Sequence, residues 1–148
     1  MCKHYIRKAP YAIYVSQYFL QSRYPCDGVF IGCSDVNIEF PGNEILKARF
    51  NKINHGFKQH KVRLGIIGAL DVEFKGHKTA IYALRLLKNR IPEFTLSCLG
   101  PGDISQWEKN CKKIGIEDNV EFCGTLPGGR QVLEWLDSID IFLIASFT

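Results

Sequence analysis

Short apolar runs alternate with helix-like segments over residues 61–148, and this alternation is the feature that most limits the fold. The apolar runs are brief and rich in β-branched or aromatic side chains, as buried strands are, and they cover residues 62–67, 94–99, 119–123 and 141–144. Segments with helical spacing of apolar positions stand between them. Strands separated by helices pair in parallel through right-handed crossovers. The sequence therefore predicts an open α/β, Rossmann-like parallel sheet.

The helices of this sheet are expected over residues 79–89, from Asp103 to about Ile114, and over residues 131–139. Asp103 is a good N-cap for the middle helix, because its carboxylate can accept a hydrogen bond from a free backbone N–H. Gly115 is suited to end that helix, because glycine readily adopts the left-handed conformation.

The first 60 residues lack this regularity. Short extended segments are expected at residues 12–15, 29–31 and 36–38. Ser16 is a candidate N-cap for a helix that ends at Tyr24, and a second helix is expected over residues 43–53, before a polar linker at 54–60. We expect this part, which is too small for a sheet domain of its own, to be the tail of a preceding domain.

Composition excludes several classes of protein. The chain has 148 residues, 46% of them apolar, which suits one globular domain with a modest core. No apolar run is long enough to cross a bilayer, and the first residues do not resemble a secretory signal. The net charge of +4 is spread along the chain, which favours a solvated surface over weak attraction to anionic membranes or phosphorylated ligands. No nucleic-acid-binding module is recognisable.

The six cysteines do not form a metal-binding or disulfide pattern. None are paired as CxxC, no histidine stands at finger-like spacing, and Cys98 and Cys123 lie inside apolar runs where cysteine acts as a small core side chain. We expect reduced cysteines and no metal site.

Glycine-rich loops follow the first three predicted strands, at residues 68–77, 99–103 and 124–130. Ligands bind at the carboxyl ends of strands in open α/β sheets, and helix N-terminal amides together with Lys75 would suit a phosphate. Arg130 could assist a base or ribose at the third loop. Ordinary turn formation explains each loop about as well, and His77 fits a capping or surface role. No nucleophile elbow, Walker loop or dinucleotide fingerprint occurs.

The same segments resemble the family 4 glycosyltransferases. The resemblance rests on Gly68-Ala-Leu-Asp-Val-Glu-Phe-Lys-Gly-His77, on Leu99-Gly-Pro-Gly-Asp103, on residues 119–129 and 140–146, and upstream on residues 13–25. It implies a GT-B fold of two Rossmann-like domains, with the second binding a nucleotide-sugar donor and the first an acceptor. It also implies sugar transfer with retention of anomeric configuration, without a metal ion or cofactor.

Residue by residue, the resemblance matches Gly68 to the glycine near the donor phosphates and Lys75 to the lysine that holds the diphosphate. It matches Gly124, Thr125 and Leu126 to the stretch that meets the base, and Gly76 and Gly100 complete the expected donor-binding set. Many members carry an arginine where this chain has Ala69, which removes one of two cations from the phosphate site.

The resemblance divides the chain into the tail of an acceptor domain (1–40), an interdomain linker (41–60) and a partial donor-binding domain (61–148). The paired glutamates of the family would begin just beyond Thr148, so we expect a truncated chain that does not catalyse transfer alone. The implied acceptor is a glycan or a lipid-linked glycan of a surface polysaccharide, and the implied location is the cytoplasm, at the inner membrane face. The alternatives are a non-catalytic Rossmann-like module that binds nucleotide or phosphate, and a remnant that binds nothing.

Overall fold

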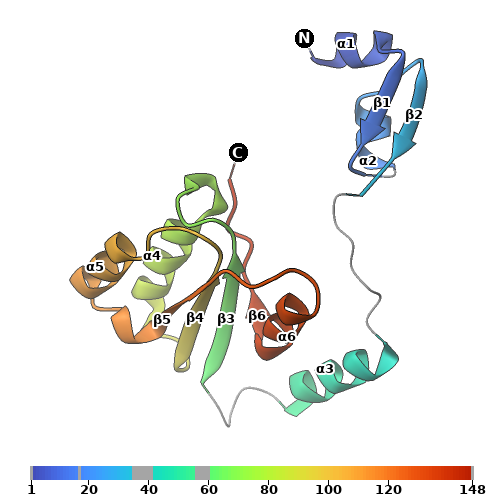
Figure 1. Ribbon diagram of the computed structural model, residues 1–148. Coiled ribbons are helices and arrows are strands. Elements are labelled where there is room, and N and C mark those ends of the chain that lie inside the picture. Colours follow the sequence, from blue (N-terminus) through green and yellow to red (C-terminus); the bar gives the residue numbers. More distant parts are fainter. Residues whose placement is uncertain (1, 17, 35–41, 56–60, 148) are drawn as a thin grey trace. The chain divides into compact units, whose positions relative to one another are not determined.

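In the computed structural model, the described residues are 2–16, 18–34, 42–55 and 61–147, and the chain divides into two compact units (Figure 1). These units are Met1–Phe40 and Pro41–Thr148. Within the described residues, no helix is both long and apolar enough to cross a membrane.

The first unit contains α1 (Cys2–Lys8), β1 (Tyr11–Tyr14), α2 (Phe19–Arg23) and β2 (Val29–Gly32). The two strands pair in parallel, with Ile13 opposite Ile31. The strand expected at residues 12–15 therefore lies one residue earlier, at Tyr11–Tyr14. Ser16 accepts a hydrogen bond from the Leu20 N–H at 2.8 Å, as a cap would, but α2 begins only at Phe19 and ends at Arg23. The expected extended segment at 36–38 lies outside the described residues.

The second unit is built around a parallel sheet. Its elements are α3 (Asn43–His55), β3 (Val62–Ile67), the 3₁₀ turn η1 (Glu73–Lys75), α4 (His77–Leu87), β4 (Phe94–Leu99), α5 (Ser105–Ile114), the 3₁₀ turn η2 (Glu117–Asn119), β5 (Val120–Gly124), α6 (Arg130–Ser138) and β6 (Ile141–Phe142). The described strands lie in the order β5-β4-β3-β6, and every pair is parallel. The α/β prediction is confirmed.

Helices cover both faces of this sheet. Leu64 and Ile66 of β3 belong to the buried cluster that contains Ile81 of α4 and Cys111 of α5, so α4 and α5 pack on the same face (Figure 1). Side chains alternate along a strand, so Gly65 points to the other face. There a Cβ on Gly65 would lie 2.8 Å from the indole of Trp135, which shows how closely α6 packs on β3.

The observed ends of α4 and the start of α5 differ from the predicted ones. Helix α4 starts at His77 and ends at Leu87, two residues earlier than expected at each end. Helix α5 starts at Ser105, although the Asp103 carboxylate does accept a hydrogen bond from the Ser105 N–H at 2.9 Å. Gly115 ends α5 with φ at 69° and donates to two carbonyls of the last turn, as predicted.

The last strand is shorter than the sequence suggested. Only Ile141–Phe142 pair with β3, whereas residues 141–144 were expected to be a strand. The Leu143 N–H still donates to the Gly65 carbonyl at 2.7 Å, and the Phe147 N–H then donates to the Phe74 carbonyl at 3.0 Å. The chain therefore leaves the sheet after Leu143 and runs against the loop that follows β3.

The six cysteines differ in burial. None of the six forms a disulfide. Cys98 lies in the core, and burial raises the pKa of its thiol to about 12, so it is inert at neutral pH. Cys123 is half-buried rather than in the core.

Candidate functional site

The carboxyl ends of β3, β4 and β5 bring the three glycine-rich loops together. The Gly68 N–H donates to the Leu99 carbonyl at 2.9 Å, and the Gly100 N–H donates to the Gly124 carbonyl at 2.7 Å. Three of the four glycines expected in the donor site, Gly68, Gly100 and Gly124, therefore lie at one edge of the sheet. The amides of Gly68 and Gly100 are already used in joining the loops, so donors to a phosphate must come from other groups.

Gly100 is required by the close approach of two loops. Its φ is 153°, and a Cβ there would lie 2.0 Å from the Gly68 carbonyl oxygen. No side chain can be accommodated against a backbone at that distance.

Lys75 lies directly over Gly68. A Cβ built on Gly68 would be 2.9 Å from Cγ of Lys75, so the aliphatic part of the lysine occupies the space that glycine leaves. The ammonium lies 5.3 Å from the centre of the Phe74 ring, a cation–π distance. The structure thus brings together the two residues that the sequence assigned to the diphosphate.

Gly76 joins η1 to α4 in the left-handed conformation, with φ at 80°. A Cβ there would lie 2.0 Å from the Ala145 carbonyl oxygen, so the segment after β6 passes directly against this turn. The first N–H groups of a helix have no partner within the helix, and within the described residues no side chain caps α4. The start of α4 therefore presents free amides and the positive end of a helix dipole beside Lys75.

The third loop is more open than the other two. Gly124 has φ at 67° with no atom within 4 Å of a built Cβ, so its conformation rather than crowding requires glycine. Thr125 is exposed and Leu126 is half-buried. Arg130 lies at the start of α6, is exposed, and forms an ion pair with Glu134 at 2.8 Å.

His77 does not have the surface role that its sequence position suggested. Only 2% of the residue is exposed, and its Nε2 lies 3.0 Å from the Gly68 carbonyl oxygen. Burial lowers the pKa of His77, and the hydrogen bond to Gly68 partly opposes that effect. The spacing of His77 from Ala80, Ile81 and Leu84, all on the buried face of α4, is the sequence signal that could have predicted its burial.

No cluster of three or more His, Cys, Asp or Glu side chains is arranged to hold a metal ion in the part of the chain that the structure describes.

The parallel sheet and its glycine-rich loops lie within residues 61–148, and the same residues match a known family of enzymes. The family model described as "Glycosyl transferases group 1" matches residues 61–148. The chain is thus a member of the group 1 glycosyltransferase family, which confirms the resemblance found in its sequence.

Individual proteins match over a longer stretch. Protein CapJ of Staphylococcus aureus is 31% identical over 149 residues, covering 99% of this chain and 35% of that protein. The amylovoran biosynthesis glycosyltransferase AmsK of Erwinia amylovora is 30% identical over 121 residues, covering 81% of this chain and 29% of that protein. The chain spans about a third of the length of these relatives.

Among solved structures, the apo form of the lipopolysaccharide outer core galactosyltransferase WaaB matches with a TM-score of 0.49 and 16% identity. The match covers 93% of this chain and 37% of that structure.

Proposed function

We propose that residues 61–148 form part of the donor-binding half of a retaining glycosyltransferase that builds a surface polysaccharide. The donor is a nucleotide-diphosphate sugar, and the acceptor is a glycan or a lipid-linked glycan. The observation that carries the proposal is the family match over these residues. The match to a protein described as an amylovoran biosynthesis glycosyltransferase supports the choice of a glycan product.

In this proposal the loop after β3 binds the diphosphate. Lys75 supplies a positive charge, and the first amides of α4 supply hydrogen-bond donors and the helix dipole. Negative charge develops on the diphosphate as the bond to the sugar breaks, so these fixed groups stabilise the transition state more than the ground state. Lys75 and the α4 amides thus stabilise the charge that a divalent ion stabilises in other enzymes.

The base is proposed to lie against the loop after β5. Gly124, Thr125 and Leu126 offer backbone at an open edge, while Gly76 and Gly100 allow the neighbouring chain segments to pack closely against each other. The acceptor would bind outside residues 61–148. Transfer is proposed to occur on the cytoplasmic side, with peripheral contact at the inner face of the membrane.

Calorimetric titration of the 148-residue chain with UDP, GDP and inorganic pyrophosphate tests this function. We expect saturable binding of one of the two nucleotides, and roughly tenfold weaker binding by Lys75→Ala, the loss of about one charge-assisted hydrogen bond. Lys112→Ala, which removes an exposed lysine on α5, is the matched control and should bind as the wild type does.

Equal binding by wild type and Lys75→Ala would overturn the assignment of the phosphate site. The alternative of a non-catalytic phosphate-binding module predicts that pyrophosphate binds as tightly as the nucleotides. A donor site predicts weaker binding of pyrophosphate, because the contacts to the base are missing.

A further inference from the structure

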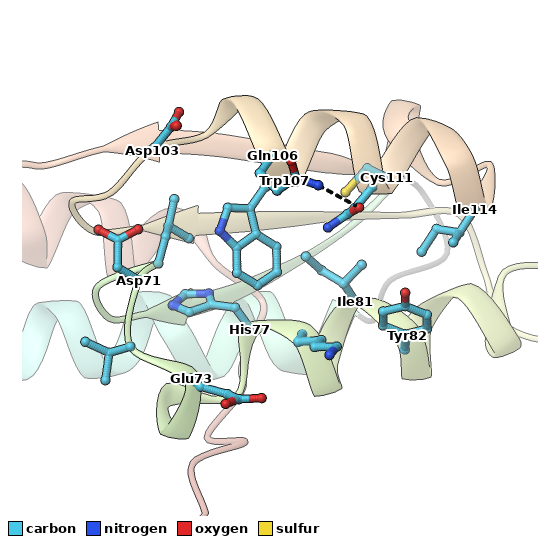
Figure 2. A pocket seen from close by; sticks show the side chains of 14 residues that line it. Asp71, Glu73, His77, Ile81, Tyr82, Asp103, Gln106, Trp107, Cys111 and Ile114 are labelled. Atoms are coloured by element: carbon cyan, nitrogen blue, oxygen red, sulfur yellow. Dashed lines mark hydrogen bonds between the residues drawn. The ribbon is translucent and has the colours of Figure 1, made fainter.

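A pocket of about 440 Å³ lies between α4 and α5, beside the loop that follows β3 (Figure 2). Its lining does not include Gly68 or Lys75. The pocket shares His77 and Lys78, at the start of α4, with the proposed phosphate site, but the nucleotide proposed above does not account for its apolar wall. Pockets of this volume are large enough to hold a small organic ligand.

One wall of the pocket is apolar. Leu70, Ile81 and Ile114 line it together with the half-buried indole of Trp107. An indole beside aliphatic side chains is a surface on which the C–H face of a ring can rest.

The rim of the pocket is polar and negative. Among the described lining residues, the carboxylates of Asp71, Glu73 and Asp103 outnumber the ammonium of Lys78. The Asp103 carboxylate already accepts the Ser105 N–H, whereas those of Asp71 and Glu73 are exposed at the mouth. These carboxylates accept hydrogen bonds from hydroxyl or amine groups, and they disfavour an anion inside the pocket itself.

His77 gives the pocket a polar group without a partner. Because the Gly68 carbonyl can only accept, the Nε2 atom beside it at 3.0 Å must carry a proton. In the neutral ring Nδ1 is then a bare acceptor, and it is buried with no hydrogen-bond partner among the described residues. Figure 2 shows the imidazole below the indole of Trp107, and the two ring centres are 6.2 Å apart.

We infer that this pocket binds a neutral pyranose, whose C–H face packs on Trp107 and whose hydroxyls donate to Asp71, Glu73 and Nδ1 of His77. The ligand class follows from the combination of an apolar wall with acceptors at the rim and at the base. A buried acceptor needs a donor, and the inference assigns that role to a ligand hydroxyl because His77 lines the pocket. The inference goes beyond the proposed function, since it requires no nucleotide.

Other ligand classes fit less well. An anion inside the pocket would meet three carboxylates against one ammonium. A quaternary ammonium has no N–H to donate to Nδ1, although it would suit the negative rim. A primary amine on an apolar ring satisfies the charge but offers a single donor group, whereas a pyranose offers several around one ring.

The test is a titration of the 148-residue chain with the methyl glycosides of glucose, galactose and N-acetylglucosamine. The imidazole nitrogen resonances of His77 are followed by NMR. We expect saturable binding of at least one glycoside, with a shift of the Nδ1 resonance in the direction of an accepted hydrogen bond. Asp71→Ala and His77→Phe should each bind about tenfold more weakly, and Lys112→Ala should bind as the wild type does.

Asp71 is exposed, so its variant remains informative if His77→Phe fails to fold. Cyclohexylamine serves as the ring-shaped amine control, and choline as the quaternary one. The inference is overturned if no glycoside binds, if either amine binds more tightly than every glycoside, or if a glycoside binds without moving the Nδ1 resonance. It is also overturned if Asp71→Ala leaves glycoside affinity unchanged. Uridine diphosphate binding reports separately on the proposed function.

Discussion

His77 is a polar residue that the fold places in the core beside the phosphate loop. It is almost fully buried, its Nε2 is held by the Gly68 carbonyl, and burial lowers its pKa. A histidine with these properties is neutral at pH 7, so it fixes the backbone of the loop without adding charge.

Acidification should therefore destabilise the protein through His77. The unfolded chain binds a proton near pH 6.5, whereas the folded chain resists it, so the stabilising contribution is complete above pH 6.5 and is lost as the pH falls from there toward the lowered folded-state value. Urea unfolding at pH 7.5 and at pH 5.5 should show a smaller free energy of unfolding at the lower pH. In His77→Phe this dependence should be much reduced; an unchanged dependence would mean that another group causes it.

Gly76 is constrained both by its conformation and by its neighbour. In Gly76→Ala the new Cβ meets the Ala145 carbonyl while the backbone stays at positive φ. We expect a loss of about 1–3 kcal/mol in the free energy of unfolding. Gly128→Ala is the matched control, because nothing lies within 4 Å of a Cβ there and its φ is not positive. Equal stability of the two variants, measured by urea unfolding, would contradict the close contact.

At the scale of elements, α3 is attached to the sheet by polar groups rather than by a buried face. No residue of α3 is buried. The Arg49 guanidinium donates to the carbonyls of Ile139 and Asp140, and the Lys52 ammonium lies 2.8 Å from the Asp140 carboxylate. That carboxylate is fully buried and also accepts the Arg63 N–H at 2.8 Å. A short helix held in this way depends on a few bonds, because isolated helices of this length are marginal in water.

Removal of the Arg49 side chain should therefore loosen α3 selectively. In Arg49→Ala we expect amide hydrogen exchange in α3 to accelerate roughly tenfold, while exchange in β3 and β4 stays unchanged. Lys47→Ala, an exposed position on the same helix, should exchange as the wild type does. Similar exchange rates for the two variants would show that the Arg49 hydrogen bonds do not hold the helix.

The apolar sequence pattern predicted the central strands correctly but not the end of the last strand. Residues 62–67 and 94–99 were predicted as strands and are strands, because each is buried by partners on both sides. The strand at 141–144 was predicted too long, since among the described strands β6 has a partner on one side only, and its paired residues end at Phe142. Strand pairing is a tertiary property, so apolar character alone could not place that end.

For the molecule as a whole, sequence predicted the class of fold and the residues that gather at the sheet edge. Parallel topology places Gly68, Gly100 and Gly124 together, and the hydrogen bonds from Gly68 to Leu99 and from Gly100 to Gly124 confirm that arrangement. The sequence could not predict that the segment near Ala145 packs on Gly76, or that His77 lies under Trp107. Both contacts join parts of the chain far apart in sequence, and local patterns carry no information about them.

The central claim is that the loop after β3 and the start of α4 bind a nucleotide diphosphate. Its most direct test is an amide NMR map of the 148-residue chain with UDP or GDP, whichever binds, compared with the nucleoside alone. We predict that the diphosphate, and not the nucleoside, shifts the amides of Lys75, Lys78 and Thr79, and that Lys75→Ala weakens this response. Shifts confined to other parts of the chain, or an identical response in Lys75→Ala, would contradict the claim.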